Sequence, residues 1–178
     1  AKDNYAFCVV CQNGHLETAN WLWSICPELE QSVMLHVRYD YAFRFACHNG
    51  HLEIAKWLLG LCQTDEEQSA MLHAKDNYAF LVACEKGHLE VAKWLWKVCP
   101  DLEKPAMLHA NDNYAFRIAC AFGHIELAKW LWIVCSDLEQ STMLHAKDNR
   151  AFCLACQNGH QEIAKWLWIV CPVEEQSA

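Results

Sequence analysis

A Gly-His pair recurs five times along this chain at an almost constant spacing. The pairs are Gly14-His15, Gly50-His51, Gly87-His88, Gly123-His124 and Gly159-His160, so successive copies are 36, 37, 36 and 36 residues apart. A fixed period of about 20 to 50 residues is typical of a solenoid, in which each unit buries its apolar face only against its neighbours. The recurrence predicts a single array over residues 1–178, with units of approximately 1–36, 37–73, 74–109, 110–145 and 146–178.

Each unit has the pattern of two antiparallel helices. In the third unit, residues 78–85 carry apolar side chains at helical spacing, and Gly87 is suited to the left-handed position that ends a helix. Residues 90–99 again place apolar side chains three and four positions apart, and Pro100 cannot continue that helix. The pattern therefore predicts an all-α chain of helix–turn–helix units.

The amino-acid sequence of the unit resembles the ankyrin repeat. In "DNYAFLVACEKGHLEVAKWLW" (residues 76–96), the segments Tyr-Ala-Phe, Ala-Cys, Gly-His-Leu-Glu and Ala-Lys-Trp-Leu-Trp match that family's Thr-Pro-Leu-His, its two small residues, its Gly-His turn and its leucine-rich second helix. The resemblance covers the whole chain. In particular, the sequence is similar to the diverged ankyrin arrays of giant viruses and amoeba-associated microbes. It implies an ankyrin-type solenoid of five stacked repeats. A tetratricopeptide-type repeat, the alternative, offers no reason for the Gly-His pair.

Three departures from the family pattern bear on the fold. The motif's Thr is replaced by Tyr5, Tyr41, Tyr78, Tyr114 and Arg150, and its first His by Cys8, Arg44, Leu81, Arg117 and Cys153. The hydroxyl–imidazole network of ordinary ankyrin repeats is thus absent, and we expect aromatic packing to replace it. The unit is also longer than the family's length of about 33 residues. Because the extra segments, such as 102–110, are rich in helix formers, we expect helical or irregular links there instead of a β-hairpin.

Twelve cysteines and ten histidines raise the question of disulfides, metal sites and catalysis. Ten cysteines form two columns, one late in the first helices and one after the second, which the predicted helix geometry keeps too far apart to pair. "CVVC" (8–11) and "CLAC" (153–156) have no equivalents in the other units. We therefore expect reduced, buried thiols, no metal or cofactor site and no enzyme activity. The histidines of the Gly-His pairs are expected to form hydrogen bonds to backbone groups between units. The links contain a second set, His36, His73, His109 and His145. These are expected to be structural, with pH sensitivity near 6 as the alternative.

Charge and hydropathy restrict the partners. A net charge of −8 disfavours nucleic acid, which requires clustered Lys and Arg, and it disfavours anionic membranes. No apolar run reaches the length of a membrane span. We expect no small-molecule substrate. The chain carries no signal-peptide pattern and no Asn-x-Ser/Thr sequon, and with reduced cysteines this favours an intracellular location, although the compartment is otherwise unmarked.

A solenoid without a catalytic motif offers an extended surface, and the ankyrin resemblance implies that this surface binds a protein. Positions that vary between units are the expected contacts, since a partner is not periodic. The candidate partner-binding residues are Arg44, His48, Leu81, Glu85, Lys86, Arg117 and Phe122. Aromatic residues and Arg are favoured at interface hot spots, so Phe122 and the two arginines are the expected anchors.

The alternative function is structural: copies of the chain could stack head to tail into a filament. Terminal units of a soluble solenoid normally carry polar caps, and neither end of this sequence has one. The candidate end-stacking residues are Phe7, Val10, Ile163, Leu167 and Val170. The two chain ends also nearly continue the internal repeat, because "VEEQSA" and "AKDNYAF" match "DEEQSA" (65–70) and residues 74–80. We therefore expect either a piece of a longer array or a self-stacking protomer.

Overall fold

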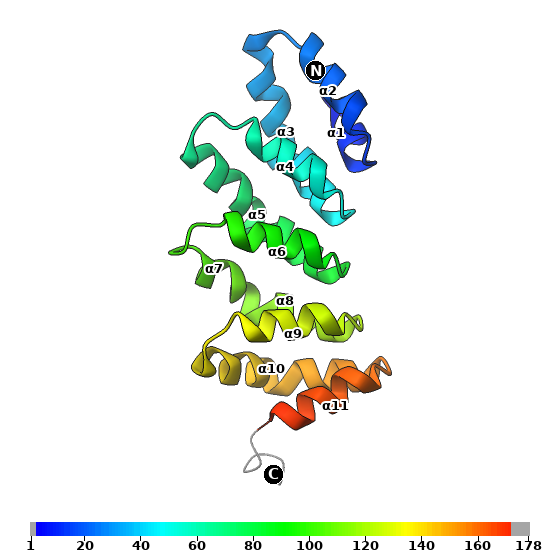
Figure 1. Ribbon diagram of the computed structural model, residues 1–178, viewed down its shortest axis with the longest axis vertical. Helices are drawn as coiled ribbons and strands as arrows, with labels where there is room; N and C mark the ends of the chain where they lie inside the picture. The colour runs from blue at the N-terminus through cyan, green and yellow to red at the C-terminus, as the bar shows by residue number, and fades with distance from the viewer. Residues whose placement is uncertain (1–2, 172–178) are drawn as a thin grey trace.

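The computed structural model describes residues 3–171, and within them the chain is helical without a strand. The helices are α1 (Asp3–Gln12), α2 (Leu16–Ile25), α3 (Glu28–His48), α4 (Leu52–Gly60), α5 (Asp65–Glu85), α6 (Leu89–Val98), α7 (Lys104–Leu108), α8 (Ala110–Ala121), α9 (Ile125–Ile133), α10 (Asp137–Gln157) and α11 (Gln161–Val170). They form hairpins that lie one below another in an elongated stack, with the two termini at opposite ends (Figure 1). The predicted all-α ankyrin-type stack is confirmed.

The stack is held together mainly through its first helices. We call α1, α8 and the second halves of α3, α5 and α10 the first helices, and α2, α4, α6, α9 and α11 the second helices, because each second helix packs against the first helix before it. Backbones approach most closely between consecutive first helices, whereas second helices contact chiefly their own hairpin partner. We call the side of the stack that the first helices form the inner face.

The Gly-His pair locks consecutive units together. Gly87 has φ of +75°, which an L side chain adopts only with strain, so glycine is favoured there. A Cβ added to Gly87 would lie 2.5 Å from Nδ1 of His124, the equivalent histidine of the next unit. The His124 ring then donates from Nε2 to the backbone oxygen of Glu85 (2.9 Å), as His88 does to that of His48 (3.0 Å). The expected inter-unit role of these turn histidines is confirmed at both positions.

The links between units contain one left-handed turn each. Three successive residues have φ between 51° and 63° in each link. They are Arg38–Tyr39–Asp40, Lys75–Asp76–Asn77, Asn111–Asp112–Asn113 and Lys147–Asp148–Asn149. The preceding histidine bonds the last residue of the turn, for instance His109 Nδ1 to Asn113 Oδ1 (2.5 Å). Before each turn the link is helical, as α7 shows, so the expected helical link in place of a β-hairpin is confirmed.

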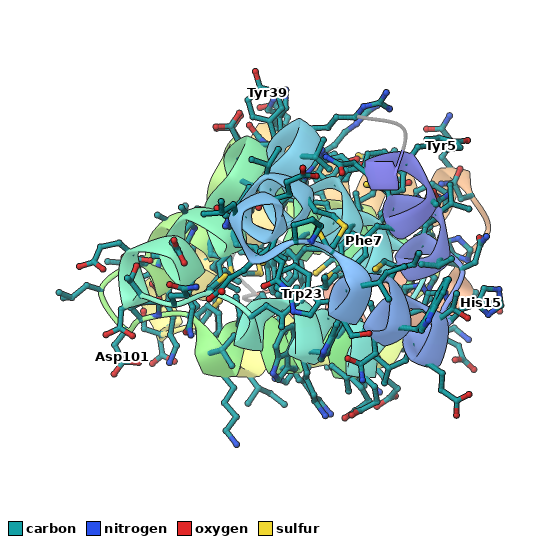
Figure 2. All side chains as sticks on the ribbon, turned by 90° about the horizontal axis from the view of Figure 1, so that it is seen from above. Tyr5, Phe7, His15, Trp23, Tyr39 and Asp101 are labelled. Carbon is teal, nitrogen blue, oxygen red and sulfur yellow. The ribbon has the colours of Figure 1, made fainter. Side chains whose placement is uncertain are left out.

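Aromatic contacts cross the junctions between units. Phe116 lies in a cluster with Trp132 of its own unit and Trp166 of the next, with ring centroids 5.8–6.2 Å apart. Phe7, Trp23 and Trp57 repeat this cluster at the other end of the stack. The view along the stack places Phe7 and Trp23 in its interior (Figure 2). The two Trp of a central "WLW" therefore serve different junctions, since the second packs on the first tryptophan of the next unit.

Candidate partner-binding surface

Half-buried aromatic side chains run along the inner face across consecutive units. We call Tyr41, Phe45, Tyr78 and Tyr114 the aromatic row. Tyr41 stacks on Phe45 with ring centroids 4.1 Å apart, and Phe45 lies 6.3 Å from Tyr78. The three tyrosines occupy equivalent positions at the start of their first helices. The fold therefore aligns side chains that are 36 or 37 residues apart in the sequence.

Polar bonds between units fix the orientation of this row. The Tyr41 hydroxyl donates to Oε1 of Gln12 in the preceding unit (3.0 Å), and the Tyr114 hydroxyl donates to Oε2 of Glu85 (3.4 Å). Burial and the neighbouring Glu85 carboxylate raise the pKa of Tyr114, so this phenol is neutral at neutral pH. Lys86 Nζ lies 3.1 Å from the other carboxylate oxygen of Glu85.

The two candidate arginines lie beside the aromatic row and hold the left-handed turns. Arg44 donates from Nε to the backbone oxygen of Tyr39 (2.6 Å) and from Nη2 to that of Arg38 (2.9 Å). Arg117 makes the same pair of bonds to the turn before it, both of 2.9 Å. The Arg44 guanidinium also lies over the Tyr78 ring, 5.0 Å from its centroid. These cations therefore stabilise the links as well as bordering the surface.

The other candidate residues differ in how far they reach solvent. Arg44 is only 8 % exposed and Leu81 only 7 %, so both support the surface from beneath. His48 is half-buried, 5.6 Å from the Phe45 ring, and bonds Asn49. Lys86 is exposed, and Phe122 is 54 % exposed with its ring stacked 6.4 Å from His124. His48, Lys86 and Phe122 lie at successive first-helix ends, so they form a ridge along the stack beside the aromatic row.

The sequence pattern did not mark Tyr41, Phe45 and Tyr78 as surface residues. The tyrosines replace a structural threonine of the family motif, which predicts internal packing. The available signal was the recurrence of a large residue with a polar tip, which commonly keeps one edge in water.

Most of the candidate end-stacking residues are buried within the chain itself. Phe7, Ile163 and Leu167 are fully buried, while Val10 and Val170 are half-buried. Trp21 at one end of the stack is 58 % exposed, and Trp168 at the other is 50 % exposed. Of the chain-end sequences that suggested stacking, residues 1–2 and 173–178 lie outside the described residues.

The core cysteines are poor nucleophiles. Burial raises the pKa of Cys11 to about 12, and it also raises the pKa of Cys47, Cys84 and Cys120, so these thiols stay protonated at neutral pH. Between the described helix ends, histidine, cysteine and glutamate side chains meet in two places, at His36, Cys62 and Glu67 and at His73, Cys99 and Glu103. Both places lie at the far end of the hairpins from the Gly-His turns. Across residues 3–171, no helix combines the length and hydropathy that crossing a membrane requires.

A family model spanning three ankyrin repeats matches residues 7–101, 43–134 and 80–172. A comparison with curated proteins found no significant match. Ankyrin repeats generally mediate protein–protein interactions and are typically non-catalytic. The overlapping matches cover most of the chain, and they agree with the stacked hairpins, the Gly-His turns and the inner first-helix face. The chain therefore belongs to the ankyrin-repeat family.

Proposed function

We propose that this chain is a protein-binding module whose partner docks along the inner face, on the aromatic row and the ridge of His48, Lys86 and Phe122. The observation that carries the proposal is the run of ring contacts from Tyr41 through Phe45 to Tyr78, which crosses a junction between units, with Tyr114 at the equivalent position of the next unit. Tyrosines are favoured at protein interfaces. Tyr41 and Tyr114 would lose little side-chain entropy on docking, because inter-unit bonds already hold them. The conformation of this surface is maintained by Arg44, Leu81, Glu85 and Arg117.

The row also has the character of an interface rather than of a core. Its rings are half-buried, and its rim carries both signs of charge, with Glu85 next to Lys86. Aromatic centres surrounded by polar rims are typical of protein interfaces. A protein segment that presents apolar side chains to the row and hydrogen-bonding groups to the rim fits this chemistry.

Capture and mutagenesis together test the proposal. Proteins retained by the immobilised 178-residue chain are identified by mass spectrometry, and the affinity of each is then measured for variants. Tyr78→Ala combined with Phe122→Ala should weaken a genuine partner at least tenfold. Lys93→Ala, on the second-helix side, is the matched control and should leave the affinity unchanged. A partner insensitive to the double variant and sensitive to the control would show that docking occurs elsewhere.

A second candidate, head-to-tail stacking, is favoured by one observation. Inside the stack, the second Trp of one "WLW" packs edge-to-face on the first Trp of the next unit, as Trp96 does on Trp130 at 6.4 Å. Trp168 and Trp21 occupy the corresponding positions at the two ends, and both are largely exposed. Trp168 of one copy could therefore pack on Trp21 of another copy. Such a heterologous contact propagates as a filament.

Analytical ultracentrifugation over a wide concentration range tests this second candidate. Stacking predicts concentration-dependent assembly that Trp168→Ala or Trp21→Ala reduces, while Trp94→Ala serves as a control at an internal junction. A single monomeric species at high concentration would exclude strong stacking.

A further inference from the structure

Three different metal-ligating side chains meet where two units join. His73 lies in α5, Cys99 ends α6, and Glu103 precedes α7. Nε2 of His73 lies 2.6 Å from Oε2 of Glu103 and 3.9 Å from Sγ of Cys99. The three ligand atoms all lie within 4.8 Å of one another. Ligand atoms about a tetrahedral Zn²⁺ lie roughly 3.3–3.8 Å apart, given metal–ligand bonds of about 2.0–2.3 Å. Shifts of about an ångström would therefore complete the geometry.

Neighbouring residues orient two of these ligands. The other ring nitrogen of His73, Nδ1, donates to Oδ1 of Asn77, which leaves Nε2 facing the cysteine and the carboxylate. Ser69 donates from Oγ to Oε2 of Glu103 (3.0 Å). Such outer bonds to a histidine N–H and to a carboxylate are what metal sites use to fix their ligands. The nearby cation, Lys104, is engaged by Asp101 at 2.5 Å.

The same constellation occurs one unit earlier. His36, Cys62 and Glu67 place their ligand atoms within 4.8 Å of one another. Nδ1 of His36 bonds Asp40 (2.6 Å), and the backbone N–H of Gln63 donates to Glu67 (2.7 Å). A pocket of about 170 Å³ opens beside His36 and Glu67 and is also lined by Glu28 and Gln31. This junction therefore has an approach from solvent and polar groups around it.

At the following junction, the equivalent histidine, cysteine and glutamate do not form such a cluster. His109 lies 3.2 Å from Glu139, but the Cys135 thiol donates to the backbone oxygen of Leu131 (3.1 Å). The Cys99 thiol also donates to a backbone oxygen, that of Pro100, but at 3.6 Å, and its sulfur still lies 3.9 Å from His73. Among the junctions compared, two therefore bring the histidine, cysteine and glutamate ligand atoms together, and this one does not.

We propose that the clusters His36–Cys62–Glu67 and His73–Cys99–Glu103 each bind a borderline divalent cation of the Zn²⁺ type. A thiolate, an imidazole and a carboxylate form a donor set that suits Zn²⁺ and disfavours Mg²⁺ and Ca²⁺, which prefer oxygen ligands alone. On binding, the metal replaces the cysteine proton, which passes to solvent, and water completes the coordination. The ion would fasten the helical link of one unit to the second helix of the next.

The competing interpretation is that no ion binds, because His73 only pairs with Glu103, His36 only pairs with Asp40, and each cysteine merely lies nearby. The two interpretations differ in the role of sulfur. A hydrogen-bonded pair does not need the thiol, whereas a metal site of this kind forms a metal–thiolate bond. A probe that reports metal–sulfur bonds therefore separates them.

Co²⁺, which adopts the same tetrahedral sites as Zn²⁺, is that probe. Titration of the reduced 178-residue chain with Co²⁺ should produce a thiolate-to-cobalt charge-transfer band that Zn²⁺ abolishes by displacement. Cys62→Ser and Cys99→Ser should each remove about half of the band, and the double variant all of it. Glu103→Gln, at a partly exposed position, should retain the fold by circular dichroism and weaken Co²⁺ binding at its site at least tenfold.

The exposed pair Cys153 and Cys156 provides the matched control, because two exposed thiols at this spacing could also share an ion. Cys153→Ser with Cys156→Ser should leave the band intact. The proposal is overturned if the unmodified chain gives no thiolate band. It is equally overturned if the band survives the Cys62/Cys99 double variant or disappears with the Cys153/Cys156 control.

Discussion

At the scale of single residues, the Gly-His pair joins a backbone requirement to a contact between units. Glycine supplies the positive φ that ends the first helix, and its missing side chain makes room for the histidine ring of the next unit. The ring nitrogen then bonds a backbone oxygen of the preceding unit. Burial lowers the pKa of His88, so this ring is neutral at neutral pH. Both residues are therefore needed together in each unit that continues the stack.

Gly87→Ala tests this coupling. The added Cβ would strain the backbone at φ of +75° and would meet the His124 ring at 2.5 Å. We expect the free energy of unfolding to fall by more than about 2 kcal/mol in urea denaturation. Gly60→Ala is the control, since nothing lies within 4 Å of a Cβ there and the residue is helical. That variant should be neutral or stabilised by up to about 1 kcal/mol; equal effects at the two glycines would contradict the packing argument.

At the scale of elements, the links are distinguished by their left-handed turns. Three L residues in that region cost about 1–2 kcal/mol each, less for Asn and Asp. Arginine bonds to backbone oxygens and histidine bonds to Asn or Asp offset this cost. The turn forms a kink between the helical link and the next first helix, at the place where the family has a β-hairpin.

Substitutions at Asp76 test the turn. Its φ is 57° and its side chain is exposed, so backbone conformation dominates the effect. Asp76→Gly should leave the protein at least as stable, because glycine adopts this conformation freely. Asp76→Val should lower the free energy of unfolding by about 1 kcal/mol or more, because β-branched residues are disfavoured there. The opposite order of stability would show that the turn is not left-handed.

The helix start at α10 gives a pH prediction. Backbone and side-chain donors of Ser136, together with the His109 ring, lower the pKa of Glu139 from 4.5 to about 2. Because the folded pKa is the lower one, the stabilisation is complete above about pH 4.5 and is lost as the pH falls toward 2. The stability gap between the parent chain and Glu139→Gln should therefore close across this range in denaturation curves. A gap that stays constant from pH 6 to 2.5 would contradict the assignment.

At the scale of the whole molecule, each unit is stabilised almost entirely by its neighbours. The central first helices bury both sides, whereas Trp21, Trp168 and Cys156 at the ends remain exposed. The inner row of aromatic residues exists only when several units are stacked, since each unit contributes one or two of its rings. Binding and stability therefore depend on the same junctions.

Hydrogen exchange measures this dependence. Amides of α6 and α8, which have a unit on each side, should be the best protected, and those of α2 and α11 should exchange fastest. Phe116→Leu, at a Phe–Trp–Trp junction, should increase exchange in α9 and α11 more than in α2. Uniform protection from end to end would indicate one cooperative unit instead of a gradient.

The sequence by itself determined the helical solenoid, because a period of 36 residues with a glycine turn and apolar helical spacing permits few other ways to bury the apolar faces. It also showed that the family's Thr and His are replaced, although not that Arg44 and Arg117 would make polar bonds at the position of the His. These inferences depend on contacts between neighbours in the chain or between equivalent positions of adjacent units, which a repeated sequence shows directly.

Only the tertiary structure decided which side chains meet across a junction. The sequence could not show that Arg44 closes a left-handed turn, because that backbone conformation depends on packing around residues 38–40. Nor could it bring His73 to Cys99 and Glu103, 26 and 30 residues away. Those meetings depend on the angle and offset between stacked hairpins. These are set by side-chain packing between the units, which no spacing in the sequence records.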